Sequence, residues 1–283
     1  MLNCCLCTAG QLVHTLPEGL PVVGVTSLGE EIYLLRPKRD RDQVEVYDAS
    51  NYHLLRCLTV PNAATFTYMA SCKHFFCLYI SDPFVKCIHR VDLQGRPPNS
   101  TKWPVNDEPD GLSVNACHSL IVTCCTGRKI KEFSPHGDLL RDVTLPDDVI
   151  SPLHTIQLTN GQFIVCHGGL YDPIHRVCKV NEDGRHIVNS HGGQPGSNIS
   201  QFDGPCHLAV DDNEFVFVVD VNNRRVTLLS PMLDYKRQVV SRDQLKWRPR
   251  RLCSDVQRRR LYVAENELKD GKYMAGSVLV FSV

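Results

Sequence analysis

Histidine, aspartate, glutamate and asparagine are the residue types of this sequence that could bind a metal ion. Twelve histidines are scattered along the 283 residues, and His154 and His207 fall on short apolar runs. Both runs occupy the same place in a repeated unit described below, so the two imidazoles could converge on one axis. The candidate ligands of such a central site are His154, His207, Asp110, Glu265 and Asn266. The alternative, which we favour, is that these histidines are partly buried and hydrogen-bonded, with no metal or other cofactor.

Sequence signatures of common catalytic sites are absent. The chain contains no G-x-S-x-G, P-loop, G-x-G-x-x-G or H-E-x-x-H motif. Cys4 and Cys7 have the spacing of a metal or redox pair, but no second pair accompanies them. We therefore predict that the protein is not an enzyme and has no small-molecule substrate.

The fourteen cysteines are predicted to be reduced thiols that pack as small apolar residues. Several lie inside apolar runs, among them Cys77, Cys124 and Cys125. The first residues lack the basic segment and the long apolar segment of a signal peptide. No apolar run is long enough to cross a membrane. These observations favour a cytoplasmic protein with no membrane partner.

Charge is distributed unevenly along a chain that is neutral as a whole. Lys and Arg number 31, and so do Asp and Glu. Residues 220–260 nevertheless hold twelve basic residues and only four acidic ones. A neutral chain is not a general polyanion binder, so any claim of nucleic-acid binding must rest on such a local excess.

The elements that must position these residues are short strands. Apolar runs of four to eight residues, rich in Val, Ile, Leu, Tyr, Phe and Cys, are bounded by Gly, Pro, Asn and Asp, and we find no long helical periodicity. Polar turns recur at intervals of roughly 40–50 residues. Their markers, where a positive φ is expected, are Gly10, Asn51, Gly95, Gly137, Gly184 and Asp234.

This period predicts an all-β fold, a six-bladed β-propeller with four-stranded antiparallel blades. A single domain spans residues 1–283, with approximate blades at 20–61, 62–106, 107–149, 150–204, 205–249 and 250–283. The last unit ends at its third strand, so we expect residues 11–16 to supply the fourth and close the ring. Residues 3–7 also have a strand pattern and compete for a place in that blade.

The fifth unit resembles the NHL repeat. Its second strand ends in Asp220, and Asn223, Arg225 and Val226 occupy the Asn-x-Arg-Val positions that open the third strand. The motif resemblance covers residues 205–230. The rest of the chain shares only the period of the repeat. The resemblance implies a polar clamp formed by Asp220, Asn223 and Arg225, which caps strand ends and ties neighbouring blades.

In this family, propellers often follow RING, B-box and coiled-coil modules in tripartite-motif proteins. There they dock protein partners, including ubiquitin-ligase substrates, and in some members RNA. Six-bladed propellers also include metal-dependent hydrolases and lyases, which place their ligands at the mouth of the central channel. The resemblance therefore implies a docking module first and leaves RNA binding and metal-dependent catalysis as alternatives.

Propeller geometry predicts that several basic segments share one rim, because turns between second and third strands lie on the same face as the connections between blades. The predicted basic rim, with Trp247 available to stack a base, comprises Arg224, Arg225, Trp247, Lys246, Arg248, Arg250, Arg251, Lys38, Arg39, Arg128 and Lys129. We expect a monomeric propeller that docks a protein partner on this rim, with single-stranded RNA as the alternative ligand.

Overall fold

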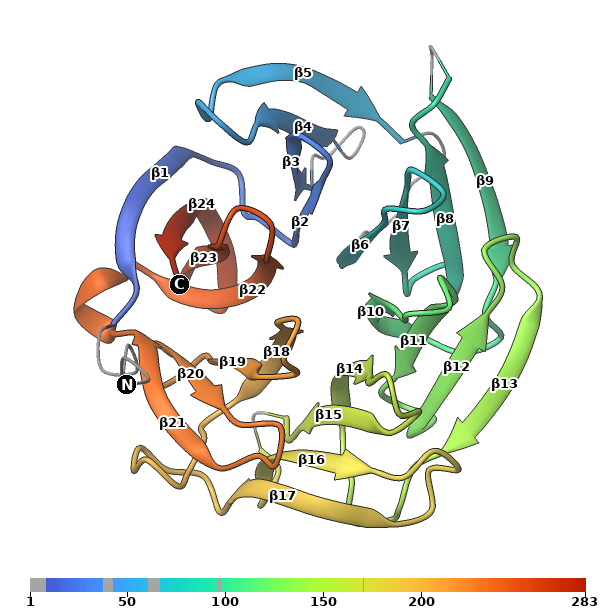
Figure 1. Cartoon of the computed structure of the whole chain (residues 1–283), viewed down its shortest axis with the longest axis vertical. Helices are drawn as coiled ribbons and strands as arrows, with labels where there is room; N and C mark the ends of the chain where they lie inside the picture. The colour runs from blue at the N-terminus through green and yellow to red at the C-terminus, as the bar shows by residue number, and fades with distance from the viewer. Residues whose placement is uncertain (1–8, 38–42, 61–66, 96–97, 170) are drawn as a thin grey trace, which may run out of the picture.

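The computed structural model describes residues 9–37, 43–60, 67–95, 98–169 and 171–283. Within them, six four-stranded antiparallel sheets are arranged as blades around a central axis, as Figure 1 shows in a view down that axis. The predicted all-β, six-bladed propeller is confirmed. The predicted strand at residues 3–7 lies outside the described residues.

The first three blades follow one another along the chain. Blade 1 consists of β2 (Gly24–Leu28), β3 (Glu31–Arg36), β4 (Gln43–Asp48) and β5 (Leu54–Thr59). Blade 2 consists of β6 (Tyr68–Cys72), β7 (Cys77–Asp82), β8 (Cys87–Asp92) and β9 (Asn99–Pro104). Blade 3 consists of β10 (Pro109–Val114), β11 (Leu120–Cys124), β12 (Lys129–Phe133) and β13 (Leu139–Thr144).

The remaining blades complete the ring. Blade 4 consists of β14 (Pro152–Gln157), β15 (Phe163–His167), β16 (His175–Val180) and β17 (Ile187–Gly193). Blade 5 consists of β18 (Pro205–Val210), β19 (Val216–Asp220), β20 (Arg225–Leu229) and β21 (Tyr235–Val240). Blade 6 consists of β22 (Arg248–Asp255), β23 (Arg260–Lys269), β24 (Lys272–Ser282) and β1 (Gln11–Gly19).

The N-terminal strand closes the ring as expected. β1 is the outermost strand of blade 6 and pairs antiparallel with β24, for example Leu16 with Val278. Asn266 fastens the same blade to blade 1, because its side chain accepts a hydrogen bond from the Val22 amide and donates one to the Val22 carbonyl, each at 2.8 Å. This pairing completes the four strands of blade 6 and so closes the ring of blades.

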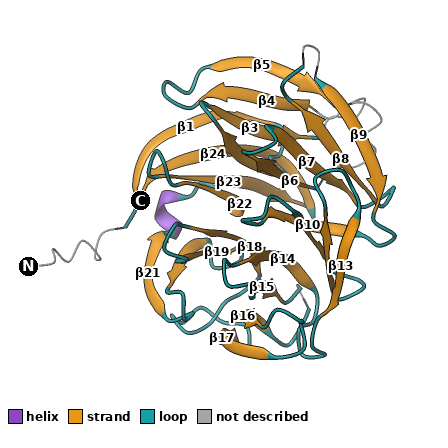
Figure 2. Cartoon of the chain, turned by 45° about the vertical axis from the view of Figure 1, so that its right-hand side comes forward, coloured by secondary structure: helices purple, strands orange, loops and turns teal. Residues whose placement is uncertain are grey.

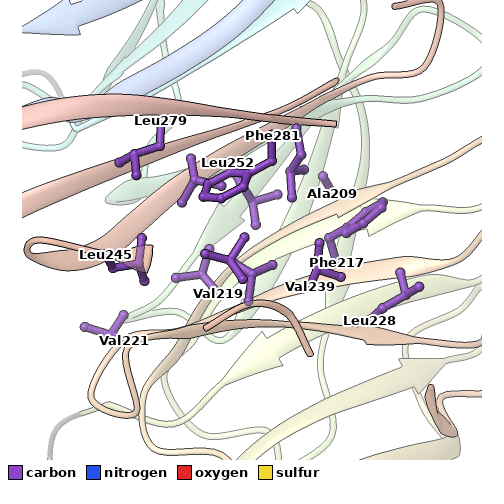
Figure 3. Close-up of a cluster of buried hydrophobic side chains, with 14 of the residues drawn as sticks. Ala209, Phe217, Val219, Val221, Leu228, Val239, Leu245, Leu252, Leu279 and Phe281 are labelled. Carbon is purple, nitrogen blue, oxygen red and sulfur yellow. The ribbon is translucent and has the colours of Figure 1, made fainter. Parts of the chain in front are cut away.

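The core is divided among the interfaces between blades. Alternate residues of a strand face opposite neighbours, since side chains alternate across a sheet. In β19, Phe217 and Val219 pack against Leu252 and Phe281 of blade 6, as Figure 3 shows, whereas Val218 packs toward blade 4. Each of the six interfaces contains a buried apolar cluster of this kind. Continuous apolar runs such as 216–219 therefore mark strands buried on both faces.

The turns need residues that tolerate positive φ. Gly137 and Gly184 adopt φ values of 97° and 78°, as predicted for these turn markers. In blade 1 the residue with positive φ is Tyr52, next to the predicted marker Asn51. In blade 5 it is Leu233, next to the predicted marker Asp234. There the Asp48 and Ser230 side chains fix the turn by hydrogen bonds, so the left-handed residue need not be Gly or Asn.

Two faces of the ring are used below. The upper face carries the turns between the second and third strands of each blade and the connections between blades; the lower face carries the other turns. Figure 2 shows the curved blades and a single purple helical segment, η1 (Arg242–Gln244), in the connection to blade 6. In the part of the chain that the structure describes, no helix has the length and apolar character needed to span a membrane.

Candidate functional site

The predicted clamp residues form one hydrogen-bonded network. Arg225 Nε and Asn223 Nδ2 donate to Asp220 Oδ2 at 2.7 and 2.8 Å, and the Asp203 amide donates to Asp220 Oδ1 at 2.8 Å. The Arg225 guanidinium also donates to three backbone carbonyls, those of Ser197, Asn198 and Gln201. Through these bonds the connection between blades 4 and 5 is held against blade 5. Arg225 is buried and donates four hydrogen bonds within this network.

Arg251 is also an interior residue. Its guanidinium lies 3.6 Å from the ring centroid of Tyr68 and donates at 3.0 Å to the carbonyls of Val23 and Thr67. Arg248, Arg250 and Arg251 belong to β22, whereas the predicted rim consists of turns and connections. The cause is the length of β23, whose Asn266 and Glu265 extend the pairing back to Arg248 and Pro249. The placement of Arg225 and Arg251 corrects the prediction that these two arginines belong to an exposed rim.

The other predicted rim cations contact groups of the same chain. Lys246 pairs with Glu18 and lies 4.3 Å from the Trp247 ring centroid, and Arg250 lies 5.0 Å from the ring centroid of Tyr273. The remaining contacts are Arg224 with the Leu245 carbonyl, Arg248 with Asn222, Arg128 with Asp147 and Lys129 with Asp142. Lys38 and Arg39 lie outside the described residues. These cations are therefore partly neutralised or desolvated before any partner arrives.

Acidic residues share the upper face with them. Asp107 and Glu108 precede β10, and Asp147 and Asp148 precede β14. Asp147 and Asp148 pair with Arg128 and with Arg176. Glu18, the partner of Lys246, also lies outside the window 220–260, so the charge balance of that window does not include it. The upper face carries charges of both signs.

A ring stack occupies the central channel near the upper face. The rings of Tyr68, His154 and His207 stack, with 4.1 Å between the two histidine centroids and an interplanar angle of 19°. His154 Nε2 is 2.9 Å from the Leu112 carbonyl and must donate to it, so Nδ1 carries the lone pair. Burial lowers the pKa of His154 to about 4 and that of His207 well below its usual value. Both imidazoles are neutral near pH 7.

The candidate metal ligands of the alternative hypothesis are not brought together in the described part of the chain. Stacked imidazoles hold their lone pairs side by side, whereas a metal ion needs lone pairs that converge on one point. Glu265 accepts hydrogen bonds from the Trp247 amide and Ser277 Oγ, and Asn266 fastens blade 6 to blade 1. Asp110 accepts one from the Cys125 amide, and burial raises its pKa to about 6. Within the described ranges, no three His, Cys, Asp or Glu side chains are placed to hold a metal ion.

A small cavity continues below the ring stack between the inner strands. Its volume is about 230 Å³, and small side chains such as Ala70, Ser113 and Ala209 line it together with His154 and His207. Among the described residues that line this cavity there is no Asp, Glu, Lys or Arg.

Large apolar side chains protrude from the upper face. Tyr171 is 94% exposed, Phe84 78%, Ile199 63% and Met274 54%. Phe84 and Tyr171 lie in turns of blades 2 and 4, Ile199 in the connection between blades 4 and 5, and Met274 near the start of β24 in blade 6. We call these four residues the apolar tips. Sequence reasoning missed them because it sorted the rim by charge alone; the available signal was a large apolar residue within a polar turn.

Comparison with known proteins supports the fold alone. No family model and no curated protein matches the chain. Virginiamycin B lyase from Staphylococcus aureus superimposes with a TM-score of 0.63 at 8% identity, covering 94% of this chain and 98% of that one. Aldose sugar dehydrogenase from Streptomyces coelicolor gives 0.63 at 11% identity, covering 96% and 98%. The Cps50 (Swd1) propeller domain of Myceliophteria thermophila gives 0.59 at 10% identity, covering 97% and 99%.

These neighbours include a lyase, a dehydrogenase and a β-propeller domain of another protein, so the fold does not select a function. The NHL resemblance of residues 205–230 remains a sequence-level observation, and the family is not established by these comparisons. Function must be argued from the faces of the ring.

Proposed function

We propose that the chain is a non-catalytic docking module that binds a protein partner on its upper face. The observation that carries this proposal is the set of apolar tips, Phe84, Tyr171, Ile199 and Met274, exposed on one face of the ring. Exposed aromatic and Met side chains of this size are typical anchors of protein interfaces. The resemblance to the NHL repeat supports the same function, including recognition of a ubiquitin-ligase substrate.

The charges of the upper face favour a protein partner over RNA. A strand of RNA needs free cations along its phosphates, but Arg225 and Arg251 are buried, and Arg128 and Lys246 are paired with carboxylates. Aspartates such as Asp148 would also repel phosphates. Mixed charges around apolar anchors instead match a protein interface with a polar rim.

The test is a capture experiment with two matched triple variants. One changes the apolar tips Phe84, Tyr171 and Ile199 to Ser; the other changes Leu54, Leu139 and Val188, which are exposed on outermost strands, to Ser. Proteins retained from cell extract by the purified chain and by each variant are quantified by mass spectrometry, with and without ribonuclease and at two salt concentrations.

We expect at least one protein whose retention falls about ten-fold or more with the tip variant, while the outer-strand variant and ribonuclease leave it unchanged. The same retained proteins with both variants would contradict the proposal. Loss of binding on ribonuclease treatment, with a steep dependence on salt, would instead support RNA recognition.

A further inference from the structure

Four arginines meet on the lower face, at the seam between blades 5 and 6. Arg237 comes from β21, Arg258 and Arg259 from the turn between β22 and β23, and Arg260 begins β23. Together they line a pocket of about 550 Å³, which is completed by Ala9, Gln11, Ser282 and Val283. We call it the arginine pocket. It lies on the face opposite the apolar tips.

The arginine pocket has an excess of positive charge. Arg258 is neutralised by Glu30 and by Asp255, at 2.5 and 3.1 Å. Among the described residues that line the pocket there is no Asp or Glu. Among the described residues, neither Arg259 nor Arg260 forms an ion pair with a carboxylate; Arg260 Nη1 donates only to the Arg259 carbonyl. The Arg259 and Arg260 guanidinium groups repel each other, so an anion bound between them would be stabilised.

The backbone holds these side chains in place. The Arg259 amide donates to the Val256 carbonyl at 3.1 Å, and the Arg259 carbonyl accepts from the Val283 amide at 3.3 Å. Arg260 is paired in the sheet with Asp255 on one side and with Ser282 on the other. The turn is therefore fixed by both neighbouring strands. Little ordering of the backbone is needed when a ligand binds, which favours affinity.

We propose that the arginine pocket binds a phosphate group. A carboxylate carries one charge and two oxygens, whereas a phosphate monoester or pyrophosphate carries close to two or more charges and at least three strong acceptor oxygens. Such a group can accept hydrogen bonds from several guanidinium groups at once. Each planar guanidinium can donate two parallel hydrogen bonds, which a Lys ammonium cannot do. The same chemistry is offered by a phosphorylated side chain of a partner and by a free phosphorylated metabolite.

The first measurement is a calorimetric titration of the whole chain with inorganic pyrophosphate at 50 and 300 mM NaCl. We expect saturable binding at one site that weakens at the higher salt. The double variant Arg259→Ala/Arg260→Ala should bind at least ten-fold more weakly. The matched control, Arg185→Ala/Arg242→Ala, removes two arginines outside the pocket and should change the affinity less than two-fold.

A second variant separates binding from folding. Arg259→Lys/Arg260→Lys keeps both charges but removes the planar forks, so it should fold like the unmodified chain and still bind several-fold more weakly. Absence of saturable binding at 50 mM NaCl would overturn the proposal. Equal weakening in the pocket variant and in the control would also overturn it, because the effect would then come from net charge.

The source of the phosphate is distinguished by two further ligands. A short phosphoserine peptide is compared with its unphosphorylated form, and both are compared with pyrophosphate. Tighter binding of the phosphopeptide indicates a phosphorylated partner, and tighter binding of pyrophosphate indicates a small phosphorylated ligand. The Ser variant of the apolar tips should bind both as the unmodified chain does, so failure of the upper-face proposal and failure of this one are observed separately.

Discussion

His167 shows how a single residue makes the fold sensitive to acid. Its Nε2 accepts from Arg176 Nε at 3.1 Å, and its Nδ1 lies 3.2 Å from the Ile150 carbonyl, so Nδ1 must donate. In the neutral tautomer each ring nitrogen therefore makes one hydrogen bond. A second ring N–H, on Nε2, would point at the Arg176 donor and find no acceptor. Burial and the Arg176 charge lower the pKa of His167 to about 4. Folding thus holds this imidazole in its uncharged form.

The lowered pKa of His167 determines how the stability of the fold changes with pH. Below pH 6.5 the unfolded chain binds a proton at His167 and the folded chain does not, so stability is lost as the pH falls toward 4. The slope is up to about 1.4 kcal/mol per pH unit for one such histidine. His167→Gln keeps an acceptor for Arg176 and a donor for Ile150, and should reduce the slope in urea unfolding between pH 6.5 and 4. Exposed His53→Gln is the control; equal slopes in both variants would contradict the assignment.

At the scale of elements, the clamp of Asp220, Asn223 and Arg225 fastens two strands and a connection to one another. It joins the end of β19, the start of β20 and the connection between blades 4 and 5, all through the buried Asp220 and Arg225. Arg225→Ala leaves Asp220 buried without its cation, which should lower the free energy of unfolding by roughly 3–5 kcal/mol. Urea unfolding at pH 7 measures this loss. Exposed Arg185→Ala should cost less than about 0.5 kcal/mol, and a loss as small for Arg225→Ala would refute the structural role.

The strands and their grouping into blades were the features that the sequence predicted best. Strand length, turn residues and period follow from backbone preferences that act locally, so the blades and the closing strand could be predicted. The directions in which side chains point could not be predicted in the same way. Arg224 and Arg225 are adjacent in the chain, yet only Arg225 is buried in the clamp, because β20 begins at Arg225 and Arg224 belongs to the preceding turn, where its φ is 52°. The counter-charges of the rim were missed because they are distant in sequence: Asp147 and Glu18 lie 19 and 228 residues from Arg128 and Lys246, the cations with which they pair.

At the scale of the whole molecule, stability depends on closing the ring. Leu16 of β1 is fully buried against blade 1, whereas Leu12 of the same strand is exposed. Leu16→Ala should therefore lower the free energy of unfolding by about 2–5 kcal/mol, and Leu12→Ala by less than about 0.5 kcal/mol. Denaturant unfolding followed by tryptophan fluorescence compares them. Similar effects of the two substitutions would mean that β1 does not seal the ring.

The two faces of the closed ring have different chemistry. The upper face presents the apolar tips among charges of both signs, and the lower face presents the arginine pocket. The channel between them contains neutral, stacked histidines that belong to the packing of the inner strands. A rigid ring with two distinct surfaces is suited to holding partners, and the docking proposal depends on the upper one.

Amide hydrogen exchange with the captured partner tests that proposal most directly. The account predicts slower exchange, on adding the partner, in the upper-face segments 83–86, 171–174, 194–204 and 270–275. Exchange in the lower-face turns 115–119 and 211–215 should not change. Protection confined to the lower face or to the outermost strands, with the apolar tips unprotected, would contradict the central claim that this propeller docks its partner on the upper face.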